Sequence, residues 1–259
     1  MFKIVLLGGK SFSSLKKIIV VKKTLYIVGI ASFFVIIIGL IIGFVLYITD
    51  ANTLFKENLF FKIAHRCLAF INDVFRSIPF IILLIILIPF TRLLVGTMLG
   101  PKGAIPALVI SASPFFARVV YNSLKAVNKD TLEVLGAMGA SLPIKVKVIF
   151  KEALSSLVAG LTLTLVTLVG FMSAAAVIGA GGLAFLAFEY GKFGNNYPLM
   201  YLSVTTILLM VLIIQISGDY FAKKLDFTNK NKGEKNEKNL NTYNFIINYY
   251  TSFMPTKQL

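Results

Sequence analysis

Long uncharged apolar runs, separated by short polar stretches, dominate the chain. Residues 24–49 contain no charged side chain, and a helix of that length, at about 1.5 Å per residue, exceeds the ~30 Å hydrocarbon core of a bilayer. The apolar positions are continuous and do not alternate, which favours helices over the strands of an outer-membrane barrel. The pattern predicts an all-α membrane protein.

Five stretches have the composition of membrane spans. They lie at about residues 24–49, 64–90, 103–120, 157–177 and 200–217. We expect Pro79 and Pro89 to kink or end the second helix, and Pro106 and Pro114 to interrupt the third. Residues 92–102 between them are predicted to form a turn.

Three further features refine the spans. Gly29, Gly39 and Gly43 suit a close helix contact in the first span. Asp73 and Arg76, three residues apart and expected at or near the membrane interface, suit a local ion pair in the second span. The uncharged run 153–188 is too long for one crossing, so its glycine-rich break at 179–182 predicts a short re-entrant or interfacial piece after the fourth span.

The two ends of the chain differ from the 24–224 transmembrane domain. Residues 1–23 are basic, and we expect an amphipathic segment at the membrane interface. Residues 225–259 form a tail rich in Lys and Asn, predicted to be disordered through Lys238.

The composition agrees with a membrane protein and narrows its chemistry. Hydrophobic residues make up 57% of the chain and charged residues only 14%, whereas soluble domains average about 25% charged. The net charge of +15 predicts contact with anionic lipid and not with nucleic acid. With one histidine, His65, and one cysteine, Cys67, no metal cluster, cofactor or disulfide is predicted.

Charge also predicts the topology. Five spans place the termini on opposite sides of the membrane. The side that carries residues 118–151 and the C-terminus holds more Lys and Arg than the other, which predicts that both are cytoplasmic. The lysines of residues 1–23 oppose this assignment.

The longest polar break, residues 128–154, is predicted to form a helix–turn–helix. Asp130 is the expected N-cap of a first helix over 131–138, with Glu133 completing a capping box. Gly139 permits a turn.

The second helix of this break has a competing interpretation. Ser141 can cap it, with Pro143 in its first turn, but residues 144–148 alternate with the period of a strand. A lone strand would leave its edges unpaired at the membrane surface, so we favour a helix.

The predicted pair of helices combines apolar and basic side chains. Val134, Leu135, Ala137 and Met138 supply the apolar surface, and three lysines supply the charge: Lys145, Lys147 and Lys151. A groove on a partner protein could accept such a surface. The residues by themselves leave open whether it docks on a partner or rests on lipid.

The same break resembles the cytoplasmic Glu-Ala-Ala signature of ABC-importer permeases, through Glu133, Gly139 and Ile149. Further runs, within about residues 24–224, resemble the permeases of bacterial methionine importers. They are residues 76–80 (RSIPF), 88–92 (IPFTR), 95–97 (VGT), 114–118 (PFFAR), 137–141 (AMGAS) and 179–183 (GAGGL).

Some positions depart from the signature. Val134 and Leu135 replace its two alanines, Phe150 and Lys151 replace its Leu-Pro ending, and the segment is one residue shorter than usual. These departures concern the efficiency of coupling and not the class of protein.

The resemblance implies the five-span fold of an ABC-importer permease, with cytoplasmic coupling helices between spans 3 and 4, in the bacterial cytoplasmic membrane. The chain would not be an enzyme. It would form a homodimer, bind two copies of a cytoplasmic ATP-binding subunit that hydrolyses ATP, and receive methionine from an extracytoplasmic substrate-binding lipoprotein.

The resemblance and the break suggest two sets of site residues. The ATPase-coupling residues would be Glu133, Ala137, Met138, Gly139 and Ala140. Candidates for the translocation path or gate are Pro79, Pro114, Ser173, Gly179, Gly181 and Gly182.

Other functions stay open at the level of sequence. An ABC permease for another small polar substrate would share these features. An ion-coupled secondary transporter would need an intramembrane carboxylate or a broken-helix ion site, for which Asp73 is the only nearby candidate. A membrane enzyme would need clustered acid–base or metal groups that this chain lacks.

Overall fold

A computed structural model describes residues 2–50, 59–97, 100–194 and 196–226 of the chain. In these ranges the backbone forms helices joined by turns, without a strand, which confirms the all-α prediction. The elements are α1 (Phe2–Thr49), α2 (Leu59–Ser77), α3 (Phe80–Ile86), α4 (Ile88–Val95), α5 (Gly100–Lys125), α6 (Lys129–Ala137), α7 (Leu142–Ala175), the short 3-10 helix η1 (Ala176–Ile178), α8 (Gly182–Lys192) and α9 (Tyr197–Leu225).

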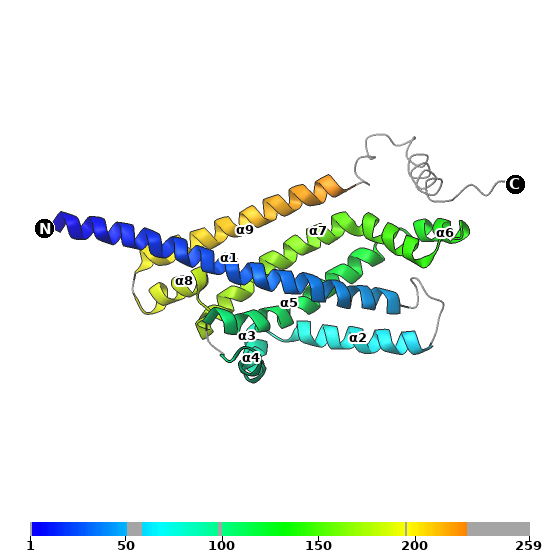
Figure 1. Cartoon of the computed structure of the whole chain (residues 1–259), viewed down its shortest axis with the longest axis horizontal. Coiled ribbons are helices and arrows are strands. Elements are labelled where there is room, and N and C mark those ends of the chain that lie inside the picture. Colours follow the sequence, from blue (N-terminus) through cyan, green and yellow to red (C-terminus); the bar gives the residue numbers. More distant parts are fainter. Residues whose placement is uncertain (1, 51–58, 98–99, 195, 227–259) are drawn as a thin grey trace.

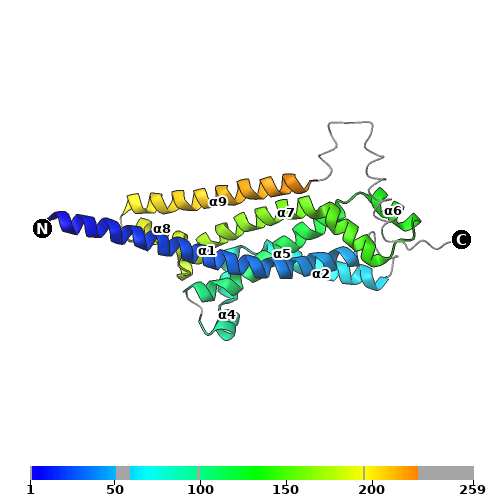
Figure 2. The ribbon, with the colours of Figure 1, turned by 45° about the horizontal axis from the view of Figure 1, so that its top comes forward.

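The long helices lie lengthwise beside one another (Figure 1, Figure 2). Helices α1, α5, α7 and α9 are each long and apolar enough to cross a bilayer, and the count becomes five if α2 and α3, which meet at a sharp bend, form one span. Helix α6 lies at one end of the bundle and α8 at the other, and we call these the α6 end and the α8 end. The chain enters at the α8 end and α9 runs toward the α6 end, as five crossings require.

Helix α5 is the centre of the bundle. In its most apolar window 67% of the residues are buried, against 6% in α9. Because α5 packs on α1, α2 and α7, it is a core helix, whereas α9 leaves most of its apolar surface for lipid or a partner.

Two glycines let α1 approach α5 closely. A Cβ atom on Gly43 would lie 2.5 Å from the Ala117 carbonyl oxygen, and one on Gly39 would lie 2.7 Å from the Phe116 ring. The predicted close contact is therefore confirmed at these two positions. It is wrong for Gly29, which faces open space.

The helix predicted for the second span is broken, not merely kinked. Helix α2 ends at Ser77, and α3 leaves it at an angle of 103°. Pro79 causes the break because it has no N–H for the helical ladder and disfavours helical conformation in the residue before it. Pro89 occupies the first turn of α4, where a missing N–H has no cost.

Two other predictions about prolines and turns were wrong. Helix α5 continues without interruption through Pro106 and Pro114, because neighbouring helices can stabilise a buried helix that lacks one hydrogen bond. The turn expected over 92–102 is shorter, since α4 extends to Val95 and α5 begins at Gly100.

Most spanning helices extend beyond the ranges that hydropathy predicted. Helix α7 begins at Leu142 and α9 at Tyr197, where the spans were expected near 157 and 200. Apolar composition marks the part of a helix inside lipid, whereas capping decides where the helix ends. Helix α8 occupies the place of the expected re-entrant piece.

The two ends of the chain are described unequally. Residues 2–23 are helical and continue directly into the first span, and their placement at the membrane interface stays a prediction. Of the tail predicted to be disordered, residues 227–259 lie outside the described residues.

Candidate functional site

Helix α6 begins earlier than predicted because Asn128 caps it. The Asn128 side chain accepts a hydrogen bond from the Asp130 backbone N–H at 3.1 Å. The expected N-cap role of Asp130 was therefore wrong, and Glu133 does not complete a capping box. Asn128 is the better cap because its extended backbone points its side chain at the free N–H groups of the first turn.

A glycine ends α6 and reverses the chain. Gly139 has a φ of +67°, and its N–H donates to the Gly136 carbonyl oxygen at 3.0 Å, while the Ala140 N–H donates to that of Leu135 at 3.0 Å. These two bonds form a Schellman motif, whose left-handed position favours glycine. The predicted turn at Gly139 is confirmed.

Helix α7 starts directly after this turn and continues without a break into the membrane. Ser141 is its N-cap and Pro143 lies in its first turn, as predicted, although the Ser141 hydroxyl makes no capping bond. Residues 144–148 are helical, so their strand-like alternation is overridden. We call α6, the Gly139 turn and residues 142–152 of α7 the elbow.

Glu152 of α7 lies beside the first turn of α6. Polar groups of the Thr131 side chain and of the Asn128 backbone are close to its carboxylate. The two arms of the elbow therefore approach each other at its open side as well as at its turn. Sequence reasoning missed this residue, although it is the only acidic residue between positions 142 and 188.

The outer surface of the elbow is small and apolar. Ala137 and Gly139 are exposed, while Met138 and Ala140 are half-buried. Leu135 is fully buried, so the prediction that it belongs to the docking surface was wrong.

Glu133 is exposed on α6 and makes no hydrogen bond or ion pair with the described part of the chain. Since Asn128 caps the helix, Glu133 is not needed for the local fold. Its carboxylate remains accessible to a partner.

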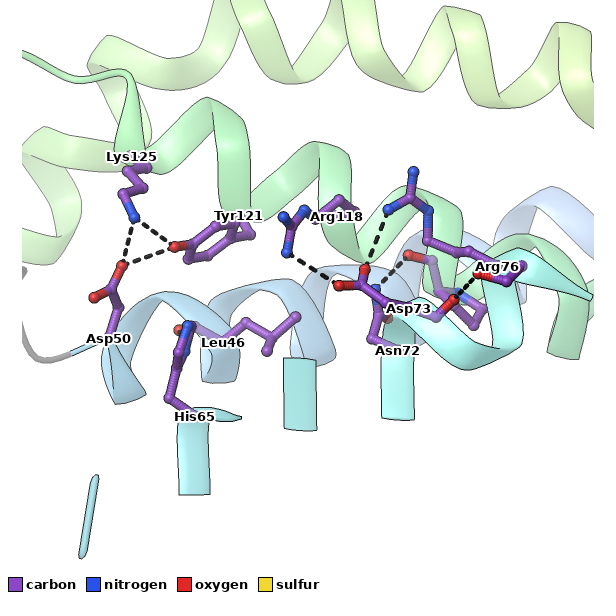
Figure 3. A network of polar contacts seen from close by, with 11 residues as sticks. Leu46, Asp50, His65, Asn72, Asp73, Arg76, Arg118, Tyr121 and Lys125 are labelled. Carbon is purple, nitrogen blue, oxygen red and sulfur yellow. Dashed lines mark hydrogen bonds and ion pairs between the residues drawn. The ribbon is translucent and has the colours of Figure 1, made fainter. Parts of the chain in front are cut away.

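A polar lock joins α1 and α5 next to the elbow (Figure 3). The buried Asp50 carboxylate accepts hydrogen bonds from the Tyr121 hydroxyl at 2.7 Å and from Lys125 Nζ at 2.8 Å. In addition, His65 Nδ1 lies 3.1 Å from the Leu46 carbonyl oxygen, which connects α2 to α1. These contacts fix the α6 end of three spanning helices relative to one another.

The candidate path residues are distributed over the bundle. Pro79 begins α3 at the 103° break, and its neighbour Phe80 stacks on Phe171 of α7 with ring centroids 4.5 Å apart. Ser173 is exposed two residues further along α7. Pro114 is buried in α5, and its carbonyl oxygen accepts a hydrogen bond from Asn72 of α2 at 3.2 Å.

The glycine break forms the turn between η1 and α8. Gly179, Gly181 and Gly182 all have positive φ angles, of +73°, +81° and +83°. The Thr24 hydroxyl of α1 accepts a hydrogen bond from the Leu183 N–H at 2.8 Å. A Cβ atom on Gly182 would lie 2.7 Å from that hydroxyl oxygen. Glycine is therefore required here by both backbone and packing.

Asp73 and Arg76 form the predicted i,i+3 ion pair, with 3.3 Å between Oδ1 and Nη1. The structure adds Arg118 of α5, whose Nη1 lies 3.9 Å from Asp73 Oδ2, as Figure 3 shows. Among the described residues, no group of three His, Cys, Asp or Glu side chains could hold a metal ion.

Residues 36–228 match the family described as the binding-protein-dependent transport system inner membrane component. The chain is 40% identical over 205 residues to a probable D-methionine transport system permease protein of Pasteurella multocida, covering 79% of this chain and 93% of that protein. It is 40% identical over 182 residues to the methionine import system permease protein of Bacillus subtilis, covering 70% and 80%.

The fold also matches a solved structure. The chain aligns with an inward-facing conformation of the MetNI methionine ABC transporter with a TM-score of 0.76 and 38% identity, over 80% of this chain and 95% of that one.

Proposed function

The chain belongs to the family of binding-protein-dependent transport system inner membrane components, and from this premise we propose that it is the membrane permease subunit of an ATP-driven methionine importer. The observation that carries the proposal is the elbow. It is exposed at one end of a multi-pass helical bundle, and one of its arms is continuous with a membrane-crossing helix.

The permease works with partners that supply energy and substrate. Two copies of the chain form the membrane unit, and a cytoplasmic ATP-binding subunit docks on the elbow of each. Because the chain itself is not an enzyme, ATP is hydrolysed only by those subunits. A substrate-binding protein delivers methionine at the α8 end.

The elbow is suited to transmit motion as one body. The Schellman turn fixes one side of it, and at the other side Glu152 of α7 lies close to polar groups of the first turn of α6. Movement of the partner is then passed to α7, whose helix continues from Leu142 to Ala175. The bundle changes between inward-facing and outward-facing arrangements as the ATP-binding subunits close and open.

The coupling residues have different roles. Ala137, Met138 and Ala140 pack into a groove of the ATP-binding subunit, Gly139 maintains the bend, and the accessible Glu133 carboxylate pairs with a basic group of the partner. Pro79, Pro114, Ser173 and the glycines Gly179, Gly181 and Gly182 belong to the moving path, where helix breaks and small residues allow rearrangement.

Co-purification and reconstitution test this function. The chain should purify with an ATP-binding subunit, and proteoliposomes of that complex should import methionine only with ATP and the binding protein. A proton gradient without ATP should drive no uptake. Uptake driven by the gradient alone would identify a secondary transporter and contradict the proposal.

A further inference from the structure

Three charged side chains meet between α2 and α5, and we call Asp73, Arg76 and Arg118 the intramembrane charge cluster (Figure 3). Asp73 Oδ1 lies 3.3 Å from Arg76 Nη1, and Asp73 Oδ2 lies 3.9 Å from Arg118 Nη1. The second distance is too long for a hydrogen bond. Arg118 is therefore attracted to Asp73 but retains free donors.

The cluster lies well inside the apolar region. Gly43 of α1 packs against Ala117 and Val120, the neighbours of Arg118, so Arg118 lies near the depth of Gly39 and Gly43. These glycines are six to ten residues before Thr49, roughly 9–15 Å along the helix at about 1.5 Å per residue. Thr49 itself ends the uncharged run, so the cluster is at the depth of hydrocarbon.

The cluster is nevertheless accessible in the single chain. The side chain of Asp73 is 48% exposed, and those of Arg76 and Arg118 are 34% and 33% exposed. Charged groups at this depth do not face lipid; they line a bundle interior or a water-filled cavity. The face of α2 and α5 that carries them is therefore turned toward the interior of the assembled transporter.

The cluster carries a net positive charge, and neighbouring side chains hold its two arginines in place. Two guanidinium groups share one carboxylate, which leaves one positive charge in excess. Arg76 forms an ion pair with Asp73, and its Cζ lies 5.9 Å from the centroid of the Phe115 ring. The guanidinium of Arg118 lies over the Tyr121 ring, with Cζ 5.3 Å from the ring centroid. This stacking orients the guanidinium plane and leaves its N–H groups available for hydrogen bonds.

Resting on the proposed import function, we propose that this cluster is a transient binding site for the charged backbone of the transported amino acid. The α-carboxylate binds the guanidinium of Arg118, and the α-ammonium group binds the carboxylate of Asp73. A guanidinium and a carboxylate form two parallel hydrogen bonds, so the site recognises an amino-acid zwitterion and leaves the apolar side chain free. Arg76 positions Asp73.

The first test measures methionine imported per ATP hydrolysed by the reconstituted complex with its binding protein. Arg118→Gln removes the charge and should lower this ratio about tenfold or more, which is the loss expected for a charge-assisted hydrogen bond. Arg118→Lys keeps the charge and should recover much of the ratio. Arg92→Gln, an exposed arginine of α4 outside the cluster, is the matched control and should leave the ratio unchanged.

A purely structural role of Arg118 gives a different result. The yield of assembled complex, ATP hydrolysis and uptake would then fall together, with a normal ratio of import to hydrolysis, and the proposal would be overturned. If the wild-type complex imported no methionine at all, the proposed function itself would fail, which is a separate outcome.

The second test uses the single cysteine of the chain. In a Cys67→Ser background, the reporter is Ser77→Cys, at an exposed position whose hydroxyl donates to the Asp73 carbonyl oxygen at 2.8 Å, so all three cluster residues stay in place. It should react with a water-soluble, negatively charged thiol reagent, and excess methionine during turnover should slow the reaction severalfold. Absence of any reaction would show that a second copy of the chain or lipid covers the cluster, and reaction without protection would show a wet face that does not bind substrate. Either result would reject the site.

Discussion

At the scale of single residues, the elbow depends on one backbone angle. Gly139 has a φ of +67° but open space around the position of a Cβ atom. A side chain here therefore meets conformational strain and no steric clash. Asparagine tolerates the left-handed region, whereas a β-branched residue does not.

We expect Gly139→Val to reduce methionine uptake by at least tenfold while the permease remains in the membrane, because the strain of a few kcal/mol opens the turn. Gly139→Asn should retain most of the uptake. The measurement is radiolabelled methionine uptake in cells, normalised to permease abundance in membranes. Gly136→Ala is the control, since Gly136 is helical and also has open space around it; equal losses in all three variants would contradict the argument.

Some features of the elbow are set by neighbouring residues, and others by residues far apart along the chain. The turn at Gly139 and the start of α7 at Ser141 could be predicted because capping is decided by neighbouring residues. The groups near Glu152 could not, because Thr131 and Asn128 are more than twenty residues away along the chain.

At the scale of helices, the approach of α1 to α5 decides how the core is packed. Gly43 faces the Ala117 carbonyl oxygen and the Val120 side chain of α5, and Gly39 faces the Phe116 ring. Close backbone approach at small residues is a main source of helix association in membranes, where apolar burial gives little driving force. The helix pair therefore depends on the absence of a side chain at Gly43.

We expect Gly43→Val to separate α1 from α5 and to destabilise the permease by about 1–3 kcal/mol, the usual cost of overpacking. The carbonyl oxygen of Ala117 is backbone and cannot move aside without shifting the helix. Thermal unfolding of the purified complex in detergent measures the effect. Gly29→Ala, in open space on the same helix, should be neutral or slightly stabilising, and a similar loss in that variant would refute the packing explanation.

At the scale of the whole molecule, the order of the helices places the elbow and the α8–α9 turn at opposite ends (Figure 1). The distribution of Lys and Arg predicts that the elbow is cytoplasmic. The lysines of residues 1–23 favour the opposite orientation, and labelling from each side of the membrane distinguishes the two.

In a Cys67→Ser background, with the permease expressed without its ATP-binding subunit so that the elbow is uncovered, we expect Ala137→Cys to react with a membrane-impermeant thiol reagent only in inside-out vesicles. Phe193→Cys, which lies 73% exposed in the α8–α9 turn, should react only from the outside of intact cells. The two variants are controls for each other. Reaction of Ala137→Cys from outside would reverse the topology and remove the elbow from reach of any cytoplasmic ATP-binding subunit.

The sequence by itself determined that the chain crosses the membrane about five times, where its longest polar break lies, and that this break bends at Gly139. Each of these properties depends on local composition, because hydrocarbon selects apolar runs and helix ends are selected by adjacent caps. Only the tertiary structure decided that Pro114 stays inside a helix, that α2 and α3 meet at 103°, and that Arg118 joins Asp73 and Arg76. These features depend on contacts between helices far apart along the chain, and no local pattern encodes which helices become neighbours.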